Sequence, residues 1–191
     1  MSVIRGLISG GLFFCVAVVR LSAADTDATP LAGTWRFDPD HSTELSAWGT
    51  LKLTIAVDGA KVTLTRQYAA GRRTFDEVTP LDLSRPVNLV PVEWWPDNRH
   101  IGAYLGGDKT KTIRTRLRDD GKFLRVSADF VLATQQGERA VNVLSDYKVS
   151  NNGSQLTLIE LRSTRNDPIV YTFKRVTDAK ADEAVSKGRA E

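Results

Sequence analysis

The chain has 191 residues, 41% of them hydrophobic, which is enough for one domain with its own core. A single cysteine, Cys15, and two histidines, His41 and His100, exclude a disulfide framework and a zinc site built from several histidines. The formal net charge is only +3, which argues against a nucleic-acid-binding protein, because neutralising phosphates requires a strongly basic face.

The first 24 residues have the layout of a secretory signal peptide. Arg5 precedes an apolar stretch at 6–19, and small residues lead to a cleavage site after Ala24. This stretch is too short to span a bilayer comfortably. Cleavage would remove Arg5 and Arg20, so the 26 basic residues become 24 against 23 acidic ones, a net charge of +1. We therefore expect a secreted or periplasmic protein with no transmembrane span after cleavage; an uncleaved N-terminal anchor is the alternative.

Apolar and polar residues alternate through the body of the chain, which is the pattern of strands with one buried face. Turns such as Asp58-Gly59, whose residues tolerate positive φ, separate the alternating segments. In chain order, we expect strands at 34–37, 51–57, 62–68, 72–83, 113–118, 124–132, 141–149, 156–164 and 169–175. No segment between 32 and 176 shows a helical period.

The middle of the chain and its end are less regular. Residues 84–98 contain Pro86, Pro91 and Pro96, and proline cannot donate to a sheet, so we expect a long loop or a broken edge strand there. A short strand is expected at 100–105. Residues 178–191 are half charged and are expected to form a disordered or loosely helical tail.

These patterns predict one folded domain and an all-β fold. Consecutive hairpins on this scale close into an antiparallel up-and-down β-barrel, here of about eight to ten strands, which leaves no exposed edge. An open sandwich is the alternative. The expected organisation is a signal peptide at 1–24, a flexible N-terminus at 25–31, the barrel at 32–177 and the tail at 178–191.

A short motif opens the first expected strand. Gly33-Thr34-Trp35 resembles the G-x-W motif that begins lipocalins and related small-ligand barrels. In that family the Trp sits near the closed end of the barrel, and a basic residue from the last strand packs on it; the resemblance gives this role to Arg175. A guanidinium over an indole contributes roughly 0.5–2 kcal/mol. The resemblance implies a lipocalin-like bacterial barrel that holds a small ligand, although the lipocalin disulfides are absent.

A second run, Asp38-Pro39-Asp40-His41-Ser42, is similar to the opening of the periplasmic polyisoprenoid-binding family of the YceI type. That family is also a lipid-binding barrel, but the rest of this chain does not follow it. The same run could instead form a turn in which Asp caps backbone amides, and we favour this reading over a metal site because no ligand spacing matches a known one.

The candidate ligand-binding residues are aromatic or lie among apolar neighbours. Tryptophans in irregular segments could line a barrel mouth and cover a ligand, or simply plug the barrel. Polar residues that share the parity of apolar neighbours would face the interior as the few polar groups of a pocket. The candidates are Trp48, Tyr68, Trp94, Trp95, Tyr147 and Arg162.

Two orientations stay open. Glu160 and Arg162 would face the interior by the parity of Leu156 and Leu158, but Ile159 and Leu161 are also apolar, and one bulge reverses the faces. Arg66 shares the interior parity of its strand. The arginine stripe at 114, 116 and 118 is expected on the outer face, with cross-strand partners such as Asp129, rather than as an anion-binding surface.

The sequence therefore predicts a secreted or periplasmic lipocalin-like protein that binds a small apolar or amphipathic molecule, with no cofactor, no metal and no catalysis. Ligand identity and oligomeric state stay open. One alternative is an envelope interaction protein whose barrel is filled by its own side chains. A second is a secreted hydrolase with a rim site that uses His41 or His100.

Overall fold

The computed structural model describes residues 29–45, 47–92, 94–95, 103–104, 109–134 and 137–177. The expected signal peptide, the tail at 178–191, His100 and most of the N-terminus at 25–31 lie outside these ranges. The predictions made for them therefore stay predictions.

Ten strands form one antiparallel sheet in the order β4-β3-β2-β1-β12-β11-β10-β9-β8-β5. Their bounds are β1 (Gly33–Phe37), β2 (Thr50–Asp58), β3 (Lys61–Ala70), β4 (Arg73–Asp82), β5 (Asn88–Pro91), β8 (Thr110–Arg118), β9 (Phe123–Thr134), β10 (Gly137–Val149), β11 (Gln155–Arg162) and β12 (Ile169–Arg175). A separate two-stranded sheet pairs β6 (Trp94–Trp95) with β7 (Ala103–Tyr104). The single helical turn among the described residues is η1 (Pro39–His41).

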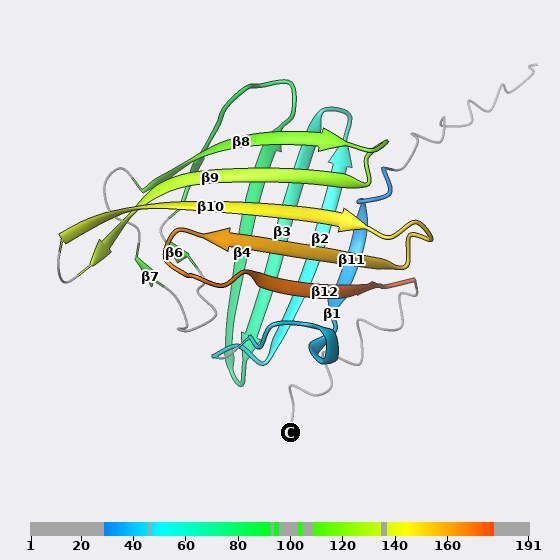
Figure 1. Cartoon of the computed structure of the whole chain (residues 1–191), viewed down its shortest axis with the longest axis horizontal. Coiled ribbons are helices and arrows are strands. Elements are labelled where there is room, and N and C mark those ends of the chain that lie inside the picture. The colour runs from blue at the N-terminus through cyan, green and yellow to red at the C-terminus, as the bar shows by residue number, and fades with distance from the viewer. Residues whose placement is uncertain are drawn as a thin grey trace, which may run out of the picture.

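The strands wrap around a common interior. Figure 1 shows β8 to β12 running across the front, with β1 to β4 crossing them steeply behind. The first and last strands join the two halves, because β1 pairs with β12 in a register that places Trp35 opposite Arg175. This confirms the all-β class and the antiparallel up-and-down barrel, with ten strands in the main sheet.

The barrel is nearly but not fully closed. Its two end strands, β4 and β5, are not hydrogen-bonded to each other in the sheet. We call the gap between them the seam. Side-chain bonds bridge one end of it: the Asp82 backbone amide donates to Asn88 Oδ1 at 2.7 Å, and Asn88 Nδ2 donates to the Asp82 carbonyl at 3.2 Å. The Asn88 amide group thus takes the place of a peptide group at this point of the missing ladder.

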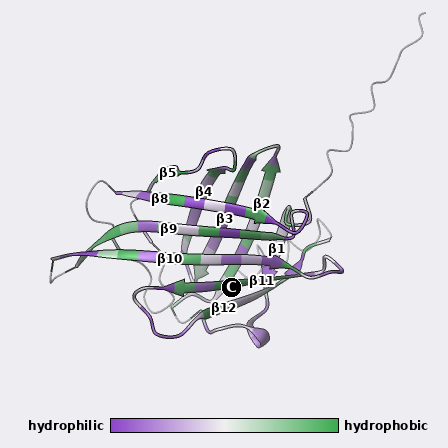
Figure 2. Cartoon of the chain, turned by 45° about the horizontal axis from the view of Figure 1, so that its top comes forward, coloured by the Kyte–Doolittle hydropathy of each residue, from purple (hydrophilic) through white to green (hydrophobic). Residues whose placement is uncertain are grey.

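Alternation along the strands decides which side chains enter the core (Figure 2). On β11, Leu156, Leu158, Glu160 and Arg162 are buried, whereas the residues between them face outward. Ile159 and Leu161 are 42% and 47% exposed. The strand therefore has no bulge, and the open orientation of Glu160 and Arg162 is settled in favour of the interior.

The first hairpin differs from the sequence-based expectation, whereas the proline-rich stretch takes one of the two forms expected for it. The first hairpin turns at Gly59 and Ala60 rather than at Asp58 and Gly59, because Asp58 still pairs with Lys61. The proline-rich stretch at 84–98 is a broken edge: it carries the short strands β5 and β6, and β5 pairs only with β8. Proline's missing N–H is tolerated at Pro91 because it ends an edge strand.

Candidate functional site: an ion cluster in the barrel and a groove at its seam

Five ionisable side chains meet inside the barrel from four different strands. They are Arg66 on β3, Glu77 on β4, Lys111 on β8, and Glu160 and Arg162 on β11, and we call them the ion cluster. Glu77, Lys111, Glu160 and Arg162 are more than nine-tenths buried. A buried charge is costly unless it is paired, so the partners decide whether such a cluster can exist.

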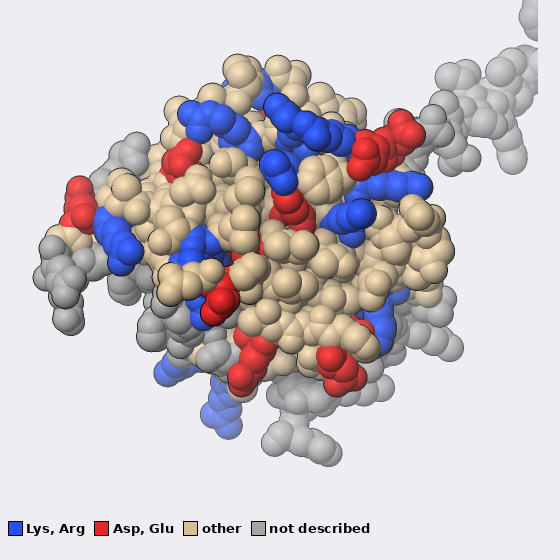
Figure 3. Space-filling model, viewed as in Figure 1, with Lys and Arg blue, Asp and Glu red and all other residues tan. Residues whose placement is uncertain are grey.

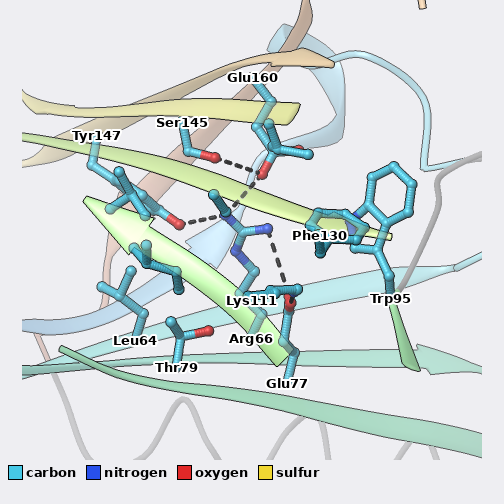
Figure 4. Close-up of a pocket in the computed structure, with 14 residues that line it drawn as sticks. Leu64, Arg66, Glu77, Thr79, Trp95, Lys111, Phe130, Ser145, Tyr147 and Glu160 are labelled. Atoms are coloured by element: carbon cyan, nitrogen blue, oxygen red, sulfur yellow. Dashed lines mark hydrogen bonds and ion pairs between the residues drawn. The ribbon is translucent and has the colours of Figure 1, made fainter. Parts of the chain in front are cut away.

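Every carboxylate in the cluster has at least two cationic neighbours. Arg66 Nη2 lies 2.8 Å from Glu160 Oε1, and Arg162 Nη2 lies 2.6 Å from Glu160 Oε2. Lys111 Nζ lies 2.6 Å from Glu77 Oε1, while Arg66 Nη1 is 3.7 Å from Glu77 Oε2. Arg66 therefore bridges the two carboxylates, and Figure 4 shows it at the centre of the network.

Neutral hydroxyl groups complete the network. Ser145 Oγ donates to Glu160 Oε1 at 3.3 Å, and Arg66 Nη2 donates to the Tyr147 hydroxyl oxygen. Burial raises the pKa of Tyr147 to about 12, so its phenol is neutral at physiological pH. The Arg66 guanidinium also lies over the Tyr147 ring, 5.6 Å from its centroid.

Opposite charges hold both carboxyl groups in their ionised form. Burial alone would raise the pKa of Glu160, but Arg66 and Arg162 lower it to about 2. Burial likewise opposes ionisation of Glu77, and the charges of Lys111 and Arg66 hold its pKa below the ordinary value. The cluster therefore consists of formed ion pairs at neutral pH.

Aromatic rings shield the cations on the side of β6 and β9. Arg162 lies over the Trp95 ring at 4.8 Å from its centroid, and Lys111 Nζ lies 5.3 Å from the Phe130 centroid. Trp95 and Phe130 touch each other edge to face, with centroids 5.1 Å apart. Such cation–π contacts strengthen when the cation is desolvated, and Arg162 and Lys111 are both buried.

The space enclosed by the ion cluster is small. A cavity of about 40 Å³ lies beside it, with Arg66, Glu77, Trp95, Tyr147 and Glu160 in its lining. That volume holds a few water molecules, at roughly 10–15 Å³ each. Small-molecule sites measure about 300–1,000 Å³, so the interior as it stands has no room for a ligand of that size.

A larger hollow of about 530 Å³ opens along the seam, and we call it the seam groove. Its walls come from the free edge of β4 and from the segment that leaves β5. The lining residues are Phe75, Asp76, Glu77, Val78, Pro91, Val92 and Trp94. Phe75 and Trp94 contact each other in this lining, with ring centroids 5.6 Å apart. Glu77 lines both this groove and the interior cavity, so the ion cluster forms part of the groove floor.

A third hollow, of about 470 Å³, lies over β8, β9 and β10, and its lining includes Asp129 and Asn142. Those two side chains bond to each other, with Asn142 Nδ2 donating to Asp129 Oδ1 at 2.8 Å. Arg114 Nη1 also lies 2.9 Å from Asp129 Oδ2, so the first arginine of the stripe has its cross-strand partner. Figure 3 shows basic and acidic side chains interleaved over this outer face.

The residues of the G-x-W resemblance meet at the junction of β1 and β12. The Arg175 guanidinium lies over the Trp35 ring at 4.1 Å from its centroid. Arg175 Nε donates to the Gly153 carbonyl at 2.7 Å, Nη1 donates to the Ala32 carbonyl at 2.7 Å, and Trp35 Nε1 donates to the Leu31 carbonyl at 3.0 Å. These contacts fasten the chain ahead of β1 to the end of the last strand.

The six predicted ligand residues fall into four groups. Trp94 lines the seam groove, and Trp95 and Tyr147 line the interior cavity. Arg162 belongs to the ion cluster. Trp48 and Tyr68 instead pack against each other in the core, with centroids 5.3 Å apart and 3% and 4% exposure, and neither lines any of the three hollows.

Sequence reasoning missed two members of the ion cluster, Glu77 and Lys111. Each carried a usable signal, because Glu77 has the parity of buried Leu81 on β4 and Lys111 has the parity of buried Ile113 on β8. A charged residue at an inward position needs a partner of opposite charge, and these two residues form an ion pair with each other.

The acidic run at 38–42 forms a tight turn against β12. Asp38 is buried and accepts from Lys174 Nζ at 2.8 Å, and its carboxylate lies 3.1 Å from His41 Nδ1. The Ser42 hydroxyl donates to the Asp38 carbonyl at 2.6 Å. No group of three or more potential metal-ligating side chains occurs among the described residues.

Within the described ranges, no helix has the length and apolar character needed to cross a bilayer.

Comparison with known proteins gives likeness in fold only. No protein-family model matches the chain. No curated protein matches its sequence. Among solved structures, apo lipid binding protein 8 of Caenorhabditis elegans matches with 9% identity and a TM-score of 0.47, over 77% of this chain and 96% of that chain. The fatty-acid-binding protein isolated from Manduca sexta L matches with 8% identity and a TM-score of 0.40, over 75% of this chain and 98% of that chain.

Proposed function

We propose that the protein is a secreted or periplasmic lipocalin-like barrel that reversibly binds a small apolar or amphipathic molecule in the seam groove. The observation that carries the proposal is the size and lining of this groove. Its volume of about 530 Å³ falls within the range of small-molecule sites, and most of its lining side chains are apolar or aromatic. Burial of a ligand there is worth roughly 25 cal/mol for each Å² of apolar surface removed from water.

We propose that the protein binds its ligand without catalysing a reaction. The described histidine, His41, lies in the turn before β2, and the neighbouring Ser42 hydroxyl is bonded to the Asp38 and Thr172 carbonyls. A serine used in this way ties η1 to β12, and nothing about it favours a nucleophile over a structural role.

A second candidate function rests on the interior. The ion cluster and its aromatic neighbours leave only about 40 Å³ of free space in the barrel, as expected for an envelope protein that acts through its surface. The two candidates differ in what they predict for the isolated protein: the first requires a small molecule to bind, and the second does not.

Native mass spectrometry of the exported protein tests the choice. We expect a co-purifying apolar molecule of a few hundred daltons that is lost on organic extraction. A bare mass, together with unchanged tryptophan fluorescence on titration with dodecan-1-ol and retinol, would overturn the binding proposal and favour the surface-acting barrel. The fluorescence test is direct because Trp94 lines the groove.

A further inference from the structure

We propose that the seam groove selects an uncharged, flat apolar or aromatic molecule and discriminates against the anionic form of the same skeleton. This inference rests on the proposed function and adds the chemical class of the ligand. It follows from three observations: the state of the ion cluster, the charges on the groove wall, and the shape of the aromatic pair.

The ion cluster offers no free place for a charged head group. Glu160 is held by Arg66 at 2.8 Å and by Arg162 at 2.6 Å, and Glu77 is held by Lys111 at 2.6 Å. A ligand carboxylate could reach these cations only by displacing a carboxylate that is already there. The displaced group would then be buried without its partner, which is strongly unfavourable. The cavity of about 40 Å³ has room for a few water-sized atoms but not for the body of a ligand.

The wall of the groove disfavours an anion as well. Among the residues that the structure describes, the ionisable side chains in its lining are Asp76 and Glu77. Asp76 is exposed on the outer edge of β4 and accepts a bond from Gln67 Nε2 at 3.3 Å, which leaves its charge in place. An anionic ligand would therefore lie close to the Asp76 carboxylate, which carries a charge of the same sign.

A cationic ligand gains little from the Glu77 carboxylate. The Glu77 carboxylate is already neutralised by Lys111 at 2.6 Å, with Arg66 Nη1 at 3.7 Å behind it. A ligand cation drawn to Glu77 would meet these two positive groups at close range. An uncharged ligand meets neither conflict, and it leaves every ion pair of the cluster intact.

The aromatic pair at one end of the groove favours a flat molecule. Phe75 and Trp94 are tilted by 44° with centroids 5.6 Å apart, and Val78, Pro91 and Val92 supply the remaining apolar surface. Aromatic rings pack best in offset or tilted arrangements, so a planar ring can add to this pair at the groove edge.

A matched ligand series tests the inference on the full-length exported protein. The probes are 2-naphthylmethanol, 2-naphthoate and 2-naphthylmethylammonium, which share one ring system and differ in charge at pH 7.5. Two-dimensional amide NMR would follow the binding. We expect the alcohol to shift the signals of Phe75, Val78, Val92 and Trp94, and the carboxylate to bind about tenfold more weakly or worse.

Substitutions separate the location from the charge preference. Val78→Glu, at an exposed groove position, should weaken binding of the alcohol about tenfold, whereas Leu89→Glu, at an exposed position outside the groove lining, should leave it unchanged. Asp76→Asn should narrow the difference in affinity between the alcohol and the carboxylate, because it removes the charge that repels the carboxylate.

The outcomes distinguish this inference from the proposed function. Equal or tighter binding of the carboxylate or the ammonium, or shifts at Tyr147 and Glu160 with none at the groove, would overturn the uncharged-ligand inference while leaving small-molecule binding in place. Binding of the alcohol that Val78→Glu does not weaken would overturn the location. No binding by any of the three probes, together with a bare native mass, would remove the proposed function itself.

Discussion

At the scale of single residues, the junction of β1 and β12 depends on Gly33. Its backbone has φ of +132°, a conformation that L side chains rarely adopt. A Cβ added there would lie 2.8 Å from Arg175 Nη1, so the missing side chain is what lets the guanidinium reach the Ala32 carbonyl. One glycine therefore permits both the strand geometry and the arginine contact.

Gly33→Ala should lower the free energy of unfolding by about 1–3 kcal/mol, because it adds backbone strain and displaces Arg175 from Trp35. Gly59→Ala is the matched control: Gly59 also has positive φ, at +56°, but its added Cβ meets no atom within 4 Å. Urea denaturation of both variants would give an upper bound on the contribution of the displaced arginine, because alanine is also more strained at a φ of +132° than at +56°. Equal losses would mean that the Arg175 contact adds nothing beyond strain.

The residue-level features were readable from the sequence to different degrees. The G-x-W resemblance named Gly33, Trp35 and Arg175, which the structure places within contact of one another. Trp48 looks the same in the sequence as Trp94, yet Trp48 packs against Tyr68 in the core whereas Trp94 lines the seam groove. A tryptophan's position in a loop says nothing about which side of the barrel wall that loop covers, so sequence alone could not separate the two kinds.

At the scale of elements, the ion cluster ties together strands that share no ladder. Arg66 on β3 and Glu160 on β11 are joined only by side chains, because three strands separate β3 from β11 in the sheet order. Ion pairs across a barrel link strands that are not adjacent, and their strength depends on how far water is excluded from them.

A double-mutant cycle with Arg66→Met and Glu160→Gln measures the coupling free energy of this ion pair. Each single change should cost about 3–5 kcal/mol of unfolding free energy, because it leaves a buried charge short of a partner, and the coupling between them should exceed about 1 kcal/mol. The matched cycle uses Arg114→Ala and Asp129→Ala, an exposed pair 2.9 Å apart, which should couple by less than about 1 kcal/mol. Similar coupling in the two cycles would contradict the role given to burial.

The hydrogen bonds between Asp82 and Asn88 at one end of the seam lead to a second prediction about elements. Asn88→Ala should cost about 1–3 kcal/mol and speed hydrogen exchange of the Asp82 amide, because that amide loses its acceptor at 2.7 Å. Asn151→Ala, at an exposed turn, serves as the control and should change neither quantity. Unchanged exchange at Asp82 in the Asn88 variant would show that the seam is held by other contacts.

Alternation predicted the strands well because the period of two is local to each strand. The same local rule left Glu160 and Arg162 undecided, because both faces of β11 carry apolar residues. Local alternation could not predict the ion pair between Glu77 and Lys111. These residues lie 34 positions apart on strands that are not paired, and only closure of the barrel brings them together.

At the scale of the whole molecule, the ion cluster sets the response to acid. The pKa of Glu160 is about 2 in the folded protein against an ordinary 4.5, and that of Glu77 is also lowered. Between these pH values the unfolded chain binds more protons than the folded one, so stability falls as the pH falls.

We therefore expect the urea midpoint to be steady near neutrality and to fall progressively from about pH 4.5 toward pH 2. Denaturation curves at intervals across this range would measure the slope. In Glu160→Gln one of the responsible carboxyl groups is missing, so the slope should be shallower although the protein is less stable throughout. A slope unchanged by this substitution would place the acid sensitivity elsewhere.

The pairing of β1 with β12 governs the order in which the molecule can be assembled. Arg175 bonds to a carbonyl 143 positions earlier in the chain, and β1 has no other neighbour on that side. Contacts between such distant segments are slow to form because a long loop must first be closed. A chain growing from its N-terminus can therefore seal its sheet only when its final strand has been made. A chain cut short before residue 169 would leave β1 and β11 with open edges, to which strands of a second molecule would pair.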